Sequence, residues 1–137
     1  MKQLNEHLYF ATQIQPQDVP QLRAAGIEQI ICHRPDGESP EQPDFADITQ
    51  AAAAENITAL HYPVAGEFPA AMVDGTWQAL QGGKTTLMYC RSGTRSCIIW
   101  ALGEAAHGAD AQQLMTQAAA IGYDLSPVKA LLESVAR

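Results

Sequence analysis

Short apolar runs and segments with helical periodicity alternate along this chain. The runs rich in β-branched and aromatic residues predict strands, and they cover residues 7–11, 27–32, 57–64 and 84–89. The segments between and after them repeat apolar residues three or four positions apart, as Phe45, Ile48 and Ala52 do. This spacing predicts helices over residues 16–25, 44–55, 69–80, 96–107, 109–120 and 126–136.

The order of these elements predicts the fold class. Strands separated by helices indicate an α/β fold with a mainly parallel central sheet and helices on both of its faces. A chain of 137 residues can bury one core and is too short for two typical domains, so we expect a single domain over residues 1–137. The loops that follow parallel strands gather at one edge of the sheet, so residues 33–39, 65–68 and 90–96 should share a rim.

A reactive loop is predicted on that rim. Residues 90–96 read Cys-Arg-Ser-Gly-Thr-Arg-Ser and join a predicted strand to a predicted helix. The backbone N–H groups of such a loop can converge on one anion, and the guanidinium of Arg95 can add two parallel hydrogen bonds. The same surroundings favour a thiolate, which would make Cys90 a nucleophile. The residues expected to bind the oxyanion are Arg91, Ser92, Gly93, Thr94 and Arg95.

A structural turn around a small buried cysteine is the alternative interpretation of this loop. Packing, however, gives no reason for two arginines to flank one glycine. The neighbouring Cys32 is expected to be a buried strand residue, with a resolving thiol for Cys90 as the alternative. His33 and Arg34 are expected to line the same rim.

The charge balance narrows the possible partners. Eight basic residues against fifteen acidic ones give a net charge of -7, and no basic run is present. We therefore expect neither nucleic acid nor a membrane surface as a partner. The substrate should be a phosphorylated or sulfur-containing small molecule or protein.

The cysteines and the N-terminus suggest a location. Three irregularly spaced cysteines do not form a disulfide framework, and a reducing compartment suits a free thiolate. Residues 1–10 lack the apolar centre of a signal peptide, and no apolar run reaches the ~20 residues needed to span a bilayer. We therefore expect a cytoplasmic protein. The scattered histidines and cysteines predict no metal site, and no cofactor is expected.

From Leu4 to Ser96 the chain resembles the phosphatase-like domain of bacterial beta-lactamase hydrolase-like proteins. The resemblance rests on His33-Arg34-Pro35-Asp36-Gly37-Glu38, Gln42-Pro43, Tyr62-Pro63-Val64 and residues 90–96. It implies a fold similar to that of dual-specificity protein tyrosine phosphatases. It also implies that Cys90 is the nucleophile and Arg95 the phosphate-binding arginine.

The length of the loop points to a second chemistry. Tyrosine phosphatases carry Cys-x-x-Gly-x-x-Arg, and here Gly93 matches but Arg95 comes one position early. Single-domain rhodaneses carry Cys-Arg-x-Gly-x-Arg, which this loop matches residue by residue. A shorter ring of amides suits a persulfide sulfur or a sulfonate. In addition, Tyr89 stands where phosphatases commonly have a histidine.

The general acid is the other departure from the phosphatase pattern. A phosphatase must protonate its leaving group, and Glu67 is the nearest acid after the third predicted strand. Asp36 or Glu38 could substitute for it, and each of these could equally be a solvated loop charge. Ser96 could donate to the sulfur of Cys90 or cap the following helix. Sulfur transfer needs no such acid.

Three functions therefore remain open at the sequence level. The first is a hydrolase that cleaves a phosphate ester through a thiophosphate at Cys90, with Arg95, Ser96 and Glu67 assisting and Asp36 contacting the substrate. The second is a rhodanese-like sulfurtransferase that carries a persulfide on Cys90. The third is a non-enzymatic binder of anions or phosphoproteins. The residues do not indicate an oligomeric state.

Overall fold

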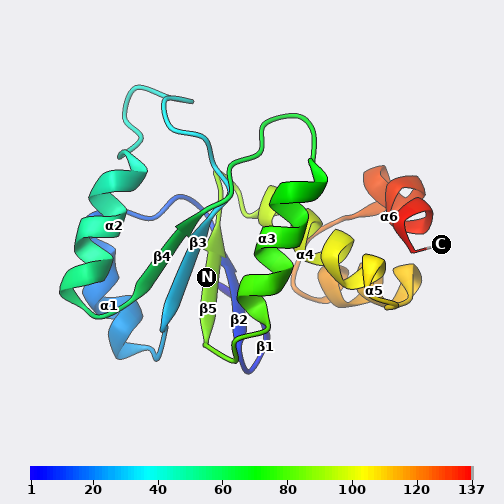
Figure 1. The fold of residues 1–137 in the computed structure, drawn as a ribbon, viewed down its shortest axis with the longest axis horizontal. Coiled ribbons are helices and arrows are strands. Elements are labelled where there is room, and N and C mark those ends of the chain that lie inside the picture. Colours follow the sequence, from blue (N-terminus) through cyan, green and yellow to red (C-terminus); the bar gives the residue numbers. More distant parts are fainter. Residues whose placement is uncertain (137) are drawn as a thin grey trace.

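A computed structural model describes residues 1–136 and contains one five-stranded sheet (Figure 1). The strands are β1 (Lys2–Asn5), β2 (Leu8–Ala11), β3 (Gln29–Cys32), β4 (Thr58–His61) and β5 (Thr86–Tyr89). Their order across the sheet is β1-β2-β5-β3-β4, and every neighbouring pair is parallel except β1 with β2. The sheet is thus mainly parallel, as predicted, and β5 lies at its centre.

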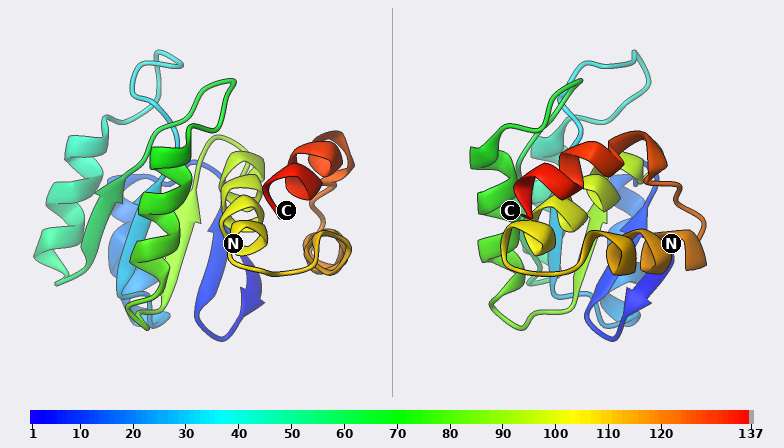
Figure 2. Two further views of the ribbon diagram at one scale, coloured as in Figure 1. Left: turned by 45° about the vertical axis from the view of Figure 1, so that its right-hand side comes forward. Right: turned by 90° about the vertical axis from the view of Figure 1, so that its right-hand side faces the viewer.

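Helices cover both faces of this sheet (Figures 1 and 2). On one face lie the 3-10 turn η1 (Pro16–Asp18), α1 (Val19–Ala24) and α2 (Phe45–Ala54). On the other face lie α3 (Ala70–Leu80) and α4 (Thr94–Ala106). The remaining elements pack outside α4 and are α5 (Ala111–Ala120), the 3-10 turn η2 (Ser126–Val128) and α6 (Lys129–Val135). The predicted α/β class is confirmed.

Two apolar cores hold the layers together, one on each face of the sheet. Side chains along β5 alternate between them, because Met88 belongs to the core under α4 whereas Leu87 and Tyr89 belong to the core under α2. All residues of β3 and β5 are buried. Each large apolar side chain buried in this way contributes about 1.5–3 kcal/mol. The two central strands are therefore a rigid support for the loops that follow them.

The sequence pattern missed strand β1. Three of its four residues are exposed, and only Leu4 is apolar, so the strand has no alternation of apolar and polar positions. It forms because the chain turns back at residues 5–8, where the N–H of His7 donates to Oδ1 of Asn5 at 2.8 Å. The other strands and helices all lie within two or three residues of their predicted positions, apart from a 3-10 start to the first and last helices.

Helix length and polarity determine whether a helix can span a membrane. Over residues 1–136, none of the helices is both long and apolar enough to cross a bilayer.

Candidate active site

The loop that carries Cys90 follows β5, the central strand, whose carboxyl end lies at the upper edge of the sheet in Figure 1. Cys90 follows the last residue of β5 and is completely buried. The N–H of Gly93 donates to Sγ of Cys90 at 3.0 Å. Gly93 is the N-cap of α4 and has a φ of +93°, a backbone conformation in which any residue with a side chain is strained. The glycine therefore turns the chain sharply into the helix while directing its amide at the sulfur.

The other loop residues hold the loop together. Arg91 and Ser92 are exposed, and the backbone carbonyl of Arg91 accepts a hydrogen bond from the N–H of Gln13 at 3.2 Å. The Ser92 hydroxyl donates to Oγ1 of Thr94 at 3.1 Å. The polar side chains at positions 92 and 94 thus bond to each other, and the N–H of Thr94 also donates to Oγ of Ser92 at 3.4 Å, so the remaining backbone N–H groups are the loop's natural donors to an anion.

Arg95 lies in the first turn of α4 and makes a bidentate ion pair. Its Nη1 donates to Oε2 of Glu38 and its Nη2 to Oε1 of Glu38, both at 2.8 Å. Nη1 also donates to the carbonyl of Val64 at 2.8 Å. The hydrogen bonds that Arg95 donates to Glu38 raise the pKa of Arg95, and the nearby Cys90 contributes to the same shift. Loops after β3, β4 and β5 therefore meet at this guanidinium, as predicted for one rim.

The donors of Arg95 are only partly used. A guanidinium has five N–H donors, and the contacts with Glu38 and Val64 take three of them. The two that remain, Nε–H and the second N–H of Nη2, lie side by side on one edge of the planar group. Apart from an interaction of the Arg95 side chain with the sulfur of Cys90, these two donors have no partner within residues 1–136. This edge is suited to a second bidentate contact with an oxyanion.

Glu38 is held as a carboxylate. The hydrogen bond from Arg95 lowers the pKa of Glu38 to about 2, and Arg34 assists. Arg34 is itself buried and donates from Nε to Oε1 of Glu38 at 2.9 Å. Its other donors reach Gln13 and Ser39 at 3.0 and 3.2 Å. A carboxylate held in this way by two arginines serves as a hydrogen-bond acceptor, which argues against Glu38 as the substitute general acid.

The remaining candidate acids occupy different places. Oδ1 of Asp36 accepts the N–H of Phe45 at 2.8 Å, so this carboxylate supports the start of α2. Glu67 is exposed and follows Val64 in the segment that touches Arg95. Residues 63–67 and 69 line a cavity of about 370 Å³ there. Both acids thus lie on loops that reach the guanidinium, but the carboxylate of Asp36 is engaged by the backbone of α2.

Ser96 belongs to a buried polar chain. Its Oγ lies 2.8 Å from Nδ1 of His33, and Nε2 of His33 lies 2.9 Å from Oγ1 of Thr76. Burial lowers the pKa of His33 to about 3, so the ring is neutral and one nitrogen donates while the other accepts. When Nδ1 carries the proton, Ser96 accepts from His33 and its own hydroxyl hydrogen is free. No local sequence pattern indicates this contact, because Ser96 and His33 lie 63 residues apart.

The other two cysteines have surroundings unlike those of Cys90. Burial raises the pKa of Cys32 to about 11 and that of Cys97 to about 12. Both thiols are therefore protonated at neutral pH and belong to the two cores. Within residues 1–136, no group of three or more His, Cys, Asp or Glu residues gathers as metal ligands.

Sequence comparisons give the context of this site. Residues 1–107 match the family model described as "Beta-lactamase hydrolase-like protein, phosphatase-like domain". The beta-lactamase hydrolase-like protein of Agrobacterium fabrum strain C58 is 35% identical over 107 residues, which are 77% of this chain and 25% of that protein. The chain thus spans about a quarter of the length of this curated relative.

Solved structures extend the comparison to the whole fold. A candidate phosphatase from Neisseria meningitidis Z2491 superposes with a TM-score of 0.84 at 35% identity, covering 98% of this chain and 96% of that one. Human DUSP28 superposes with a TM-score of 0.72 at 16% identity, covering 99% and 95%. These likenesses confirm the expected dual-specificity phosphatase-like fold.

The buried His33 generates a prediction about stability. Because the folded state depresses its pKa from 6.5 to about 3, the unfolded chain binds more protons in that interval, and stability should fall as pH drops below about 6.5. The free energy of unfolding should fall by at most about 1.4 kcal/mol for each pH unit. The free energy of unfolding, measured with urea at several pH values between 7 and 5, should change less with pH in His33→Gln than in wild type. The exposed control His7→Gln should behave like wild type.

NMR of the wild type keeps this prediction testable if His33→Gln does not fold. The ring signal of His33 should stay constant from pH 8 to 5. A signal that titrates near pH 6.5 would show that the ring is not held neutral.

Proposed function

The chain belongs to the family of phosphatase-like domains of beta-lactamase hydrolase-like proteins, and from this premise we propose that it hydrolyses phosphate esters through a covalent intermediate at Cys90. The observation that carries the proposal is the arrangement around one anion position. The Gly93 amide is directed at the sulfur of Cys90, and the free edge of Arg95 lies on the same loop. A nucleophile and oxyanion donors thus share one short segment.

In the first step, the thiolate of Cys90 attacks the phosphorus of the ester. A sulfur–phosphorus bond forms as the bond from phosphorus to the leaving oxygen breaks. Backbone N–H groups of residues 91–95 and the free edge of Arg95 bind the other phosphate oxygens. Glu67 in its acid form protonates the leaving alcohol or phenol.

In the second step, water attacks the phosphorus of the thiophosphate. The Glu67 carboxylate takes a proton from the water, and the sulfur–phosphorus bond breaks to give phosphate and the Cys90 thiolate. The hydroxyl of Ser96 assists the departing sulfur when His33 carries its proton on Nδ1, because only then is the serine hydrogen free. Arg91 and Asp36 are proposed to contact the substrate at the rim.

Glu38 has a positioning role in this proposal. Two hydrogen bonds and the contact with Val64 fix the plane of the Arg95 guanidinium, so its free edge faces one direction. Arg34 holds Glu38 in turn. An anion can bind to Arg95 without displacing Glu38, because the two use different edges of the group.

Sulfur transfer is the second candidate. The observation that favours it is the Cys-Arg-x-Gly-x-Arg spacing of residues 90–95, which matches the rhodanese loop and encloses a smaller ring than the phosphatase loop. Cys90 would then take the outer sulfur of thiosulfate as a persulfide, releasing sulfite. A third candidate, binding of anions or phosphoproteins without turnover, applies if Cys90 is unreactive.

The test of the function compares Cys90→Ser with wild type in an aryl-phosphate assay and by intact-protein mass after incubation with thiosulfate. Wild type should release phosphate and Cys90→Ser should not, whereas oxyanion binding should persist in both. A gain of one sulfur atom that depends on Cys90, without phosphate release, would replace the phosphatase with a sulfurtransferase. Equal turnover in both proteins would remove Cys90 from the mechanism.

A second test addresses the ion pair. Arg95→Lys replaces the planar fork with a point charge, and Glu38→Gln removes the charge that fixes it, so each should lower kcat/KM by about 10- to 100-fold. Glu41→Gln, an exposed change on the same loop, is the matched control and should match wild type. Steady-state kinetics with one aryl phosphate measure all three. Normal kinetics in Arg95→Lys would place the guanidinium away from the anion.

A third test addresses the acid. If Glu67 protonates the leaving group, Glu67→Gln should slow esters of poor leaving groups by about 100-fold and leave esters of good ones little changed. A series of aryl phosphates with phenols of graded acidity measures this dependence. The same loss across the whole series would exclude Glu67 as the acid.

A further inference from the structure

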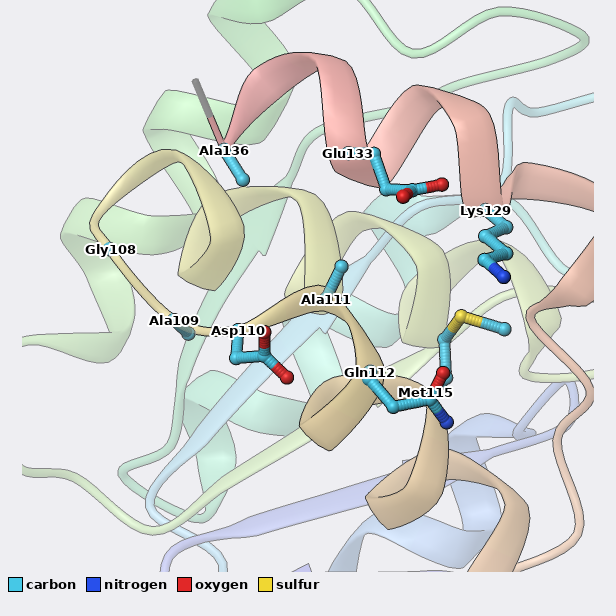
Figure 3. Close-up of a pocket in the computed structure, with 9 residues that line it drawn as sticks. All are labelled: Gly108, Ala109, Asp110, Ala111, Gln112, Met115, Lys129, Glu133 and Ala136. Carbon is cyan, nitrogen blue, oxygen red and sulfur yellow. The ribbon is translucent and has the colours of Figure 1, made fainter.

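The C-terminal helices lie beyond the part of the chain that the family model matches, which ends at residue 107. They pack on α4, on the side of that helix away from the sheet (Figure 2). Between α5 and α6 runs a groove of about 560 Å³, and Figure 3 shows Lys129 and Glu133 on α6 opposite Met115 on α5. None of its lining residues belongs to the nucleophile loop. Tyr123, in the segment between α5 and η2, lies against Gly93 of that loop.

Tyr123 is fixed on several sides. It follows α5, and its N–H donates to the carbonyl of Ala118 at 2.9 Å. Its ring packs edge-on against Phe10 of β2, with ring centres 5.8 Å apart, and Nζ of Lys2 lies 4.9 Å from the ring centre. The residue is only 7% exposed. The direction of its hydroxyl is therefore set by the sheet and by the end of α5.

The hydroxyl of Tyr123 lies against Gly93. A Cβ added at Gly93 would collide with this hydroxyl and would lie 3.1 Å from Cζ of the ring. The hydroxyl makes no hydrogen bond within residues 1–136, so it meets the loop as a packing contact. Gly93 is the residue whose N–H donates to the sulfur of Cys90. Tyr123 thus contacts the residue that donates a hydrogen bond to the nucleophile.

Electrostatics agree with this proximity. Burial raises the pKa of Tyr123, and Cys97 and Cys90 add to the shift. The phenol therefore remains protonated and uncharged at neutral pH, so it does not disfavour a thiolate beside it. A negatively charged phenolate at the same place would disfavour the thiolate.

We propose that Tyr123 is a positioning residue for the nucleophile loop, whose hydroxyl supports Gly93 from behind and keeps the Gly93 N–H directed at the sulfur of Cys90. This proposal rests on the proposed function, in which Cys90 acts as a thiolate. Glycine at positive φ is the most easily rearranged point of the loop, and a close-packed group behind it prevents that rearrangement. The C-terminal helices thereby contribute to the reactivity of a site to which they supply no reacting group.

The experiment follows alkylation of Cys90 by iodoacetamide as a function of pH, quantified by peptide mass. The pH midpoint reports how well the thiolate is stabilised, whereas the plateau rate reports access to the sulfur. Tyr123→Phe keeps the ring on Phe10 and removes only the hydroxyl. We expect its midpoint to rise by up to about one pH unit, a tenfold loss in thiolate stabilisation. Tyr9→Phe is the matched control, because Tyr9 packs against the core on the other face of the sheet, and its midpoint should not move.

A second comparison keeps the test decisive. Gly93→Ala should impair alkylation strongly, since its Cβ meets the Tyr123 hydroxyl, and adding Tyr123→Phe should recover part of that loss because the obstructing oxygen is gone. Thermal unfolding checks that each variant is folded. An unchanged midpoint in Tyr123→Phe together with purely additive effects would overturn the proposal.

The same samples separate this proposal from the proposed function. A wild type that is alkylated with a low midpoint but releases no phosphate from an aryl ester contradicts the hydrolase, and a shifted midpoint in Tyr123→Phe still supports the positioning role. A wild-type midpoint in the ordinary thiol range near 8.5 would overturn the positioning role, because there would be no stabilised thiolate to support.

Discussion

The bidentate ion pair between Arg95 and Glu38 is the constraint on which the site depends. It joins the loops after β3 and β5, and the carbonyl of Val64 adds the loop after β4. Arg34 and Arg95 share this one carboxylate, so the two guanidinium groups exceed the charge of Glu38 by one.

Much of the fold follows from local sequence patterns. The β-branched runs that become β3 and β5 are continuous and apolar, because both faces of these central strands are covered by helices. The strand that escaped prediction, β1, lies at the edge of the sheet and exposes most of its residues, so burial imposes no pattern on it. The periodicity of apolar residues reflects burial, so an edge strand that is mostly exposed has no periodicity by which to predict it.

The site divides in the same way. The loop of residues 90–96 is visible in the sequence because its cysteine, glycine and arginine are neighbours. Glu38 and His33 act on that loop from positions 57 and 63 residues away, and such pairings leave no local periodicity. Their roles depend on how β3 is placed beside β5, which only the sheet order reveals. Glu38, which the sequence offered beside Asp36 as a possible substitute for Glu67, is in the structure the carboxylate partner of two arginines.

The loop has one residue fewer between its cysteine and its arginine than the phosphatase pattern. This difference affects the backbone N–H groups of the loop more than the position of the arginine. With Gly93 in the left-handed conformation, α4 starts at Thr94, so Arg95 already lies in the helix and still reaches Glu38 and Val64. The shorter segment instead limits how many N–H groups can face one anion. Both phosphoryl and sulfur transfer can use such a ring, and they differ in whether a proton must reach the leaving group. The choice between them therefore turns on whether Glu67, three residues after the Val64 carbonyl that accepts from Arg95, supplies that proton.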